Sequence, residues 1–358
     1  MNVLEELKKN ISAKKKADPF LEGGLSTGST MLNIACSGNH KYGFLPGHFY
    51  LYVGDSGSGK TFLTLTSFAE AANSKRFDDY RLIFDCPERG ALMNFEKFFG
   101  KKMADRLEPP AGSRDNPKYS RTAEEFYYNV DTVVSAGPAI YVLDSMDALV
   151  AEDELEKFQK NKRAHASDKE GKGSYGTAKA KLNSSNLRIV HNRLQEHGSI
   201  LIIISQTREN IGFDAMFNPK TRGGGKALTF YATLEMWTSV KNHIKKTVKG
   251  KPRELGVECK VRIKKNRLTG RDRTVDIPIF HSFGIDDLGS CVDFLVEEGH
   301  WVESKGKIKA PEFEFEGSIE KLIPIIEQGK AKQLRDLVAT VWQGIEEACE
   351  VKREPRYS

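Results

Sequence analysis

The segment HFYLYVGDSGSGKTFLTLTSFAEAA, residues 48–72, joins an apolar run to a helical pattern through a glycine-rich loop. Residues 54–61 fit the pattern G-x-x-x-x-G-K-[S/T]. The run before them predicts a buried strand, and the residues after them predict a helix. In that setting the backbone N–H groups of the loop and the helix N-terminus can surround phosphate oxygens. We therefore predict a nucleotide-phosphate site, since a chance glycine-rich turn would not explain the order of strand, loop and helix.

The residue types of this loop predict ATP and Mg²⁺ as cofactors. Lys60 is expected to reach the β- and γ-phosphates, and the Thr61 hydroxyl is expected to ligate Mg²⁺. The other predicted phosphate-binding residues are Gly54, Asp55, Ser56, Gly57, Ser58 and Gly59.

Two further apolar runs end in acids. AIYVLD, residues 139–144, ends at Asp144, which we expect to hold the metal, although it could instead cap the next turn. RLIFD, residues 81–85, ends at Asp85, and Glu88 follows. Hydrolysis needs a group that orients or deprotonates water at such a strand end. We favour Glu88 over Asp85, while either acid could be exposed and without a role.

The whole chain has an α/β pattern. Four apolar runs (48–53, 81–85, 139–144, 200–205) alternate with helical patterns (61–73, 122–135, 182–197). Such alternation is typical of a mostly parallel sheet covered by helices on both faces. Consecutive strand candidates after residue 230 (231–238, 257–264 and from 274) are expected to extend the sheet as hairpins.

Three units are expected. Residues 1–24 form a short N-terminal arm, a Lys-rich amphipathic helix that is a candidate for oligomerisation. Residues 25–282 form the core, and residues 283–358 form a small α+β C-terminal domain. This last unit is expected to end in one amphipathic helix around residues 318–350.

The composition excludes some classes. The 358 residues carry 55 Lys and Arg against 49 Asp and Glu, a net charge of +6 that suits a nucleic-acid binder without identifying one. The absence of a long apolar run and of a secretory signal argues against a membrane protein and favours the cytoplasm. The five cysteines are scattered, which argues against a zinc site or a disulfide framework and favours reduced, mostly buried thiols.

Seven segments in order extend the match beyond a general phosphate loop. They are LSTGSTMLNIACSG (25–38), FDCPERGAL (84–92), YVLDSMDAL (141–149), SQTRENIG (205–212), FNPKTRGGGKALTFYA (217–232), VRIKKNR (261–267) and FGIDDLGSCVDFLVEEGHWVESKGKI (283–308). Over roughly residues 25–310 the chain resembles the RecA-type recombinases, the family of bacterial RecA and the phage UvsX-like proteins.

The resemblance implies roles for two residues. Glu88 resembles the general base that activates water, and Gln206 resembles the glutamine that senses the γ-phosphate and passes its state to a DNA-binding loop. In the family one residue separates the strand-end Asp from the catalytic Glu, whereas Cys86 and Pro87 both intervene here. If Pro87 redirects the loop, Glu88 is misplaced and hydrolysis is slow.

The resemblance also implies two loops that bind single-stranded DNA. The first is expected near residues 157–181, although a solvated insert would have the same composition. The second is expected at residues 207–226, where flexible, basic and glycine-rich sequence suits contact with the DNA backbone. The candidate contacts are Arg163, Lys172 and Tyr175 in the first loop, and Arg208, Lys220, Arg222, Gly223, Gly224, Gly225 and Lys226 in the second.

Lys265 and Arg267 resemble paired cations that reach across a subunit interface to a neighbour's ATP. Two residues apart on a strand, they would project to the same face. The alternative is an exposed basic strand without this role.

The leading hypothesis is an ATP-dependent recombinase that forms a filament on single-stranded DNA and pairs it with homologous double-stranded DNA. DNA-stimulated ATP hydrolysis would accompany this work, with mediator or single-strand-binding proteins as candidate partners. Two alternatives stay open: a ring-forming motor or helicase with the same core, and a DNA-binding paralogue in which the Pro87 insertion impairs hydrolysis.

Overall fold

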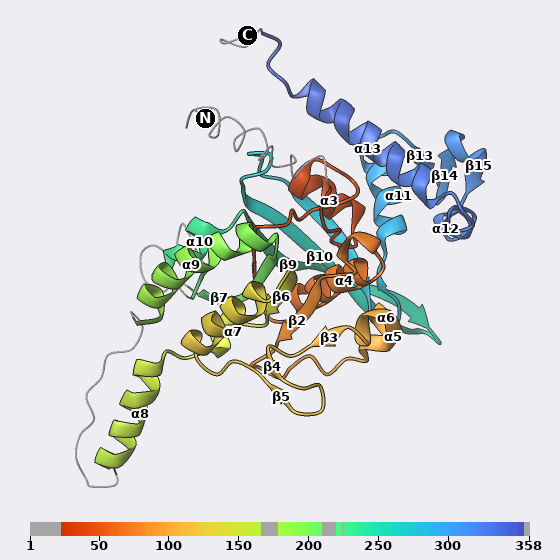
Figure 1. Cartoon of the computed structure of the whole chain (residues 1–358). Coiled ribbons are helices and arrows are strands. Elements are labelled where there is room, and N and C mark those ends of the chain that lie inside the picture. Colours follow the sequence, from red (N-terminus) through yellow and green to blue (C-terminus); the bar gives the residue numbers. More distant parts are fainter. Residues whose placement is uncertain (1–22, 166–177, 210–219, 224, 354–358) are drawn as a thin grey trace, which may run out of the picture.

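The computed structural model describes residues 23–165, 178–209, 220–223 and 225–353. The strands of its main sheet are β1 (Phe49–Gly54), β2 (Arg81–Asp85), β3 (Leu107–Glu108), β6 (Ala139–Leu143), β7 (Ile200–Glu209), β8 (Lys220–Arg222), β9 (Leu234–Val248), β10 (Lys251–Asn266), β11 (Thr274–Phe280) and β12 (Gly284–Ile285). They follow the order β12-β11-β10-β9-β1-β7-β6-β2-β3, with β8 paired to β7 (Figure 1).

The pairing confirms the predicted mostly parallel sheet. The six strands from β9 to β3 are parallel to one another. β10, β11 and β12 continue the sheet by antiparallel pairing, as the run of strand candidates after residue 230 predicts. A separate small hairpin joins β4 (Ala111–Gly112) to β5 (Pro117–Lys118).

Helices cover both faces of the sheet. One face carries α3 (Thr30–Ser37), α4 (Lys60–Ala72), α5 (Phe95–Phe99) and α6 (Lys101–Ala104), and the other carries α7 (Ala123–Ser135), α9 (Ala178–His197) and α10 (Lys226–Tyr231). Alternate residues of a strand point to opposite faces. Tyr50 and Tyr52 of β1 accordingly pack into the first layer, while Leu51 and Val53 pack into the second. The near-continuous apolar character of β1 follows from this burial on both sides.

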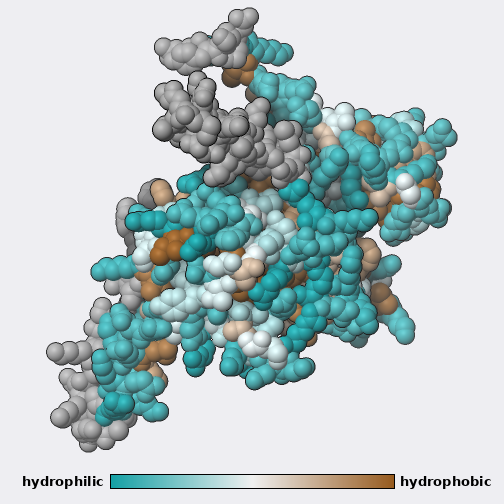
Figure 2. Space-filling model, in the orientation of Figure 1, coloured by the Kyte–Doolittle hydropathy of each residue, from teal (hydrophilic) through white to brown (hydrophobic). Residues whose placement is uncertain are grey.

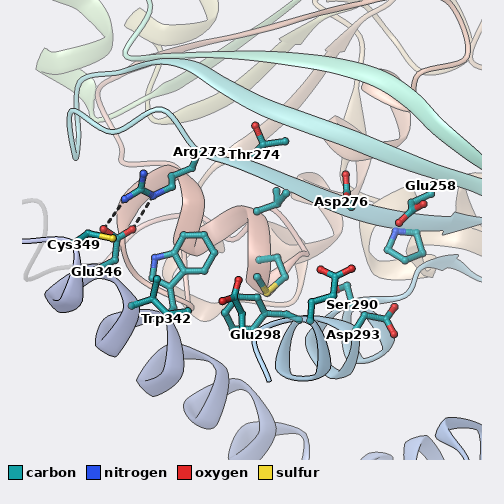
Figure 3. Close-up of a pocket in the computed structure, with 16 residues that line it drawn as sticks. Glu258, Arg273, Thr274, Asp276, Ser290, Asp293, Glu298, Trp342, Glu346 and Cys349 are labelled. Atoms are coloured by element: carbon teal, nitrogen blue, oxygen red, sulfur yellow. Dashed lines mark hydrogen bonds and ion pairs between the residues drawn. The ribbon is translucent and has the colours of Figure 1, made fainter. Parts of the chain in front are cut away.

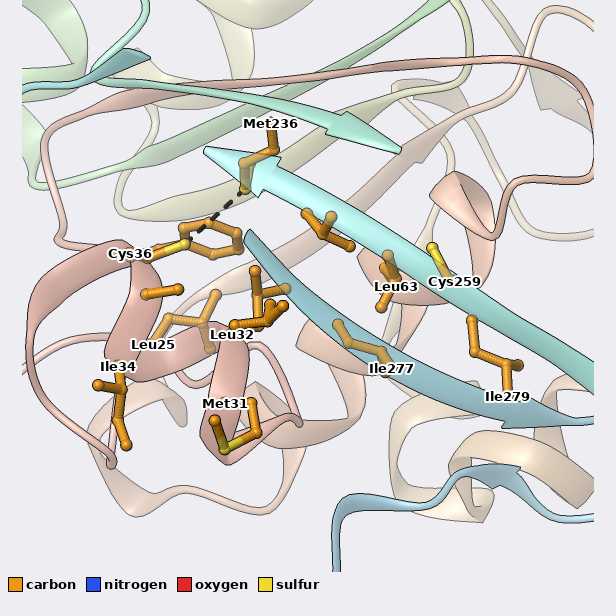
Figure 4. Packing of buried hydrophobic residues seen from close by; sticks show 14 of the residues in the cluster. Leu25, Met31, Leu32, Ile34, Cys36, Leu63, Met236, Cys259, Ile277 and Ile279 are labelled. Atoms are coloured by element: carbon orange, nitrogen blue, oxygen red, sulfur yellow. Dashed lines mark hydrogen bonds between the residues drawn. The ribbon is translucent and has the colours of Figure 1, made fainter. Parts of the chain in front are cut away.

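Figure 4 shows the first layer, where α3 and α4 pack on β9, β10 and β11. Cys36 lies in it, with its Sγ 4.0 Å from the Met236 Sδ. Four of the five cysteines are free and buried, and Cys349 is free and exposed. Figure 2 shows one mainly hydrophilic face of the molecule with separate small hydrophobic areas.

The C-terminal part differs from the prediction in one element. It contains α11 (Asp287–Glu297), a three-stranded sheet of β13 (Val302–Ser304), β14 (Lys307–Ala310) and β15 (Phe315–Gly317), and two final helices, α12 (Ile319–Glu327) and α13 (Ala331–Ala348). The prediction of one helix over residues 318–350 is therefore wrong. Gly329 has a φ of +104°, which an α-helix does not accommodate, so the chain turns between α12 and α13.

The unit boundaries at residues 25 and 283 stay predictions. Of the predicted N-terminal arm, residues 1–22 lie outside the described part of the chain. β12 still pairs with β11, so the main sheet extends to Ile285. Among the described residues, none of the helices has the length and apolar character needed to cross a membrane.

Asp287 joins the C-terminal part to the core. Its carboxylate accepts hydrogen bonds from Thr30 N (2.6 Å) and Thr30 Oγ1 (3.0 Å) of α3 and from Arg335 Nε (2.9 Å) of α13. We expect Asp287→Ala to lower the free energy of unfolding by about 2–3 kcal/mol, because three donors lose their acceptor. Urea unfolding followed by tryptophan fluorescence measures this, since Trp301 and Trp342 lie in the C-terminal part.

The matched control is Glu347→Ala, which removes an exposed carboxylate that accepts a hydrogen bond from Gln343 (2.9 Å) on the same helix. We expect that change to cost less than about 1 kcal/mol, as is typical of substitutions at exposed positions. Equal losses for the two variants would contradict the role given to Asp287.

Candidate nucleotide and DNA site

The candidate site lies where four parallel strands end. Gly54 at the end of β1 is in register with Gln206 of β7, and Asp85 at the end of β2 is in register with Leu143 of β6. The carboxyl ends of parallel strands meet at one edge of a sheet, which is where open α/β sheets bind ligands. The segments that follow these strands are thereby brought together.

The phosphate loop, residues 54–61, has the backbone that the sequence predicts. A Cβ on Gly54 would lie 2.1 Å from the Thr238 Oγ1, so this position has no room for a side chain. Gly59 has a φ of +84° and is the N-cap of α4. The Ser58 hydroxyl contacts the Thr238 hydroxyl at 2.7 Å, which fixes the loop against β9. These contacts hold the loop at the N-terminus of α4, where anions are favoured.

Lys60 is folded into the loop. Its Nζ donates to the carbonyl oxygens of Gly54 (2.8 Å) and Asp55 (2.6 Å), and the residue is buried. Burial lowers the pKa of Lys60, and the nearby carboxylate of Asp144 opposes this effect. An ammonium group bound to two carbonyls in this way can exchange them for phosphate oxygens.

Thr61 and Asp144 form the candidate metal position. The Thr61 Oγ1 donates to the Asp144 Oδ2 at 2.6 Å. Burial raises the pKa of Asp144, and the hydrogen bond from Thr61 acts in the opposite direction. A hydroxyl and a carboxylate oxygen suit Mg²⁺, which is usually bound through one or two protein ligands together with phosphates and water. The donor set of these two side chains therefore fits the predicted ion.

The structure separates the two acids of the β2 end. Asp85 is fully buried and accepts from Ser120 N (3.0 Å) and the Tyr141 hydroxyl (2.7 Å), so it serves packing rather than reaction. Glu88 is exposed at the site edge, where its Oε1 accepts from the Ser145 hydroxyl and from Gln206 Nε2 (3.0 Å). Despite the additional residue in the Cys86–Pro87 segment, Glu88 faces the ends of β6 and β7.

The predicted second DNA loop is shorter than residues 207–226. β7 continues to Glu209 and pairs with β8 through Thr207↔Arg222 and Glu209↔Lys220. We call residues 207–209 and 220–222 the loop stem. The prediction that this whole segment is a loop is wrong at both ends, because backbone pairing extends beyond Gln206 and α10 begins at Lys226. Residues 210–219 and Gly224 lie outside the described residues.

The loop stem contacts the phosphate loop directly. Asp55 accepts a hydrogen bond from the Thr207 hydroxyl and forms an ion pair with Lys220. The hydrogen bond from Lys220 holds the pKa of Asp55 below its usual value. A phosphate-loop residue thus contacts a predicted DNA-binding residue within one subunit.

Arg222 is not where the sequence predicts it. Its side chain is 8% exposed and donates to the carbonyl oxygens of Gly223 (2.9 Å) and Gly225 (3.0 Å) and to the Thr229 hydroxyl. Glu235 lies 4.0 Å from the guanidinium. Arg222 therefore anchors the start of α10 in this conformation instead of facing DNA. Pairing within the stem turns it inward.

The remaining candidates of this loop have different positions. Arg208 has a 63% exposed side chain, and Lys226 is exposed at the first position of α10. Gly223 and Gly225 follow β8, and Gly225 has a φ of +78°. Arg208 and Lys226 therefore place positive charge on the surface beside the stem.

The predicted first DNA loop, residues 157–181, is partly helical. α8 (Glu152–His165) includes its first nine residues, and α9 begins at Ala178. Three acids in the first turn of α8 and the lack of Gly and Pro through residue 165 favour this helix. α8 projects from the body of the molecule (Figure 1). Arg163 is an exposed residue of this helix. Lys172 and Tyr175 lie outside the described residues.

Lys265 and Arg267 lie together, away from the phosphate loop. Lys265 Nζ donates to the carbonyl oxygens of Thr229 (2.5 Å) and Phe230 (2.9 Å), and Arg267 Nη2 donates to Phe230 O (2.7 Å). These carbonyls end α10, where cations are favoured. Burial, with repulsion from Arg267, lowers the pKa of Lys265 to about 8.

Three contact residues were missed from the sequence. Ser145 hydrogen-bonds Glu88, Thr207 hydrogen-bonds Asp55, and Asp147 accepts from Gln206 N at 2.7 Å. The sequence does mark Asp147 as unusual, because it is the one acid in the otherwise apolar run MDALV. The Thr207 contact depends on how the stem lies against the phosphate loop, which no local pattern encodes.

A pocket of about 360 Å³ lies elsewhere, between β11, α11 and α13 (Figure 3). Phe294 and Trp342 line it together with several acids, and an ion pair of Arg273 with Glu346 (2.7 Å) borders it. Burial and the neighbouring Glu297 raise the pKa of Asp293 to about 6. Carboxylates repel phosphates, so this pocket does not compete with the phosphate loop as a nucleotide site.

Comparison with known proteins identifies the family of the chain. The family model of the RecA N-terminal domain matches residues 116–286. The RecA protein of Ectopseudomonas oleovorans is 30% identical over 319 residues, which are 88% of this chain and 78% of that protein. The chain belongs to the RecA-type recombinase family. Other RecA-family relatives include the RecA protein of Chlorobaculum tepidum, 30% identical over 286 residues, which are 77% of this chain and 70% of that protein.

The lowered pKa of Lys265 predicts unusual reactivity. At pH 8 about half of its amino groups are neutral, because the pH equals the pKa, and only the neutral amine is nucleophilic. We expect acetic anhydride at limiting dose to acylate Lys265 before Lys241, whose pKa is raised by hydrogen bonds to Asp276 and Glu258. Peptide mass spectrometry measures both rates.

The rate at Lys265 should level off above about pH 8, and Arg267→Ala should move this point to higher pH by removing a repelling charge. A rate that still rises in parallel with that of Lys241 up to about pH 10 would contradict the assignment.

Proposed function

We propose that this protein is an ATP-dependent recombinase that assembles on single-stranded DNA as a helical filament and pairs it with homologous double-stranded DNA. The observation that supports this most is the direct contact of Glu88 with Gln206 beside the phosphate loop. A residue suited to activating water thereby touches the first residue before the DNA loop. The same proposal places this recombination in the cytoplasm and includes mediator or single-strand-binding proteins as partners.

The site residues have consistent chemical roles in hydrolysis. The N–H groups of residues 54–61 and Lys60 would bind the phosphates of ATP, and Thr61 with Asp144 would hold Mg²⁺. When bound, Mg²⁺ neutralises charge on the β- and γ-phosphates. Glu88 would accept the proton of the attacking water, and its contacts with Ser145 and Gln206 orient its carboxylate.

The position of Lys265 and Arg267 supports action between subunits. Lys265 is in register with Glu235 near the start of β9, whereas Gly54 of the phosphate loop is in register with Thr238. At about 3.3 Å per residue, three residues of strand separate the two levels by roughly 10 Å. Both cations also turn toward α10, so they would bind a neighbour's nucleotide more readily than their own. Hydrolysis would then require assembly.

The loop stem supports coupling to DNA. Arg208 and Lys220 are exposed basic residues at the base of residues 210–219. Backbone phosphates attract such side chains without regard to sequence. Because Lys220 is paired with Asp55 of the phosphate loop, DNA bound by Lys220 would change the surroundings of the nucleotide.

ATP hydrolysis with and without single-stranded DNA tests the proposal, run on the purified protein, Lys60→Ala and Glu88→Gln. We expect stimulation by DNA in the natural sequence and a loss of at least about 100-fold in both variants, as for removal of catalytic groups. Glu88→Gln should still bind ATP, since Glu88 touches no residue of the phosphate loop in the contacts above.

Electron microscopy of the same samples separates this function from its competitors. Filaments that require both ATP and DNA support the recombinase. Closed rings with strand-separating activity would identify a motor instead. DNA binding that depends on ATP but proceeds without turnover would identify a paralogue impaired in hydrolysis.

A further inference from the structure

Asp147 is a partly buried acid at the site that the roles above leave unassigned. It lies in the single turn η2 (Met146–Ala148), three residues after Asp144, and its side chain is 11% exposed. Its Oδ2 accepts hydrogen bonds from the Ser205 hydroxyl (2.8 Å) and from Gln206 N (2.7 Å). Its Oδ1 lies 3.4 Å from Arg208 Nη2. One carboxylate therefore contacts three residues of β7, namely Ser205, Gln206 and Arg208.

These bonds determine where Gln206 lies. The backbone N–H of Gln206 is held by Asp147, and the side chain of the same residue reaches Glu88 through Nε2 at 3.0 Å. The turn that carries Asp147 also carries Ser145, which donates to the same Glu88 oxygen. A charged acceptor makes the hydrogen bond to Gln206 N stronger than a neutral one would. Glu88 and Gln206 are thus positioned from one short segment.

Asp147 also lies close to Gly223, the residue that follows the other strand of the stem. A Cβ built on Gly223 would lie 2.6 Å from the Asp147 Oδ1, so the carboxylate occupies the space that a side chain there would need. Gly223 directly follows β8. Asp147 therefore bonds to β7 and leaves no room for a side chain at the end of β8, in addition to the contacts of the stem with Asp55.

We propose that Asp147 is a positioning residue that holds Gln206 in register with Glu88 and so connects the state of the metal-site turn to the DNA loop. The inference rests on the proposed function. Because both carboxylate oxygens already face donors, Asp147 acts through Gln206 and Arg208 rather than as a ligand of the nucleotide or its metal. Asp144 would then hold the metal, and Asp147 would position the base of the DNA loop.

The test compares Asp147→Ala with Asp147→Asn in DNA-stimulated ATP hydrolysis. Asn keeps a carbonyl oxygen that can accept from Gln206 N and the Ser205 hydroxyl, whereas Ala removes the acceptor. We expect kcat of Asp147→Ala to fall by about 10- to 100-fold, since small displacements of a reacting group have effects of this size. Asp147→Asn should recover kcat to within about threefold of the natural sequence, while Kd for a fluorescent ATP analogue stays within about twofold in both variants.

Hydrogen exchange gives a second readout that does not depend on activity. The Gln206 amide should exchange faster in Asp147→Ala than in the natural sequence, and Asp147→Asn should restore its protection. The matched control is Asp286→Ala, which removes a carboxylate that accepts from Gly289 N (2.8 Å) in the C-terminal part and should leave the Gln206 amide unchanged. If Asp147→Ala fails to fold, Asp147→Ser replaces it, because a serine hydroxyl is too short to span the same contact.

The outcomes separate the inference from the function. Absence of DNA-stimulated hydrolysis in the natural sequence would overturn the proposed function. Stimulated hydrolysis in the natural sequence with undiminished kcat in Asp147→Ala would overturn the role of Asp147 alone. Equal losses in the Ala and Asn variants, or a loss of ATP affinity that matches the loss of kcat, would likewise overturn it, because a general structural defect has that signature.

Discussion

The parallel alignment of β1, β2, β6 and β7 is the constraint on which the site depends. Because these strands run in the same direction, the segments after Gly54, Asp85, Leu143 and Ser205 all emerge at one edge of the sheet. Four stretches of chain that are far apart in sequence thereby place a phosphate loop, a metal carboxylate, a candidate base and a glutamine within contact. Burial of each strand on both faces holds this alignment, since a shift of one residue would exchange the two layers of side chains.

The charges at this edge account for how nucleotide and DNA can be connected. The phosphate loop presents Asp55 to the stem through Thr207 and Lys220, and the metal-site turn presents Asp147 to its base. Both carboxylates bind groups that belong to the DNA-loop segment. An added negative charge, whether of phosphate at the loop or of DNA at the stem, competes for the same cations. The stem is short and is bound by Asp55 and by Asp147. A change in charge at the phosphate loop can therefore alter the position of the stem, and the reverse also holds.

Much of this site could be predicted from local sequence. The phosphate loop, the strand-end acids and the helices on either face follow from contiguous patterns, so Lys60, Thr61, Asp144 and Glu88 are placed together without knowledge of the tertiary structure. The additional residue in the Cys86–Pro87 segment left the position of Glu88 open from the sequence, and in the structure Glu88 lies beside Ser145 and Gln206. The sequence favours Glu88 over Asp85, and the structure buries Asp85 against Ser120 and Tyr141 while Glu88 is exposed.

The rest depended on pairing and register that no single segment specifies. The sequence of the loop predicts that Arg222 is a surface cation. In the structure, the pairing of β8 with β7 directs its side chain toward Glu235. The spacing of apolar residues predicts one helix across residues 318–350. The positive φ of Gly329, which ends that helix, cannot be inferred from this spacing. The sequence alone does not distinguish Asp147 from an acid that only ends a turn. Its hydrogen bond to Gln206 N makes the distinction.

The most direct measurement of the account is the ratio of ATP hydrolysis rates with and without single-stranded DNA in Gln206→Ala beside the natural sequence. The account places Gln206 between Glu88 and the DNA loop, so it predicts a ratio well above one for the natural sequence and a ratio near one for the variant. A variant that keeps the full ratio would contradict the account, because DNA would then reach the hydrolytic residues by a route that does not include Gln206.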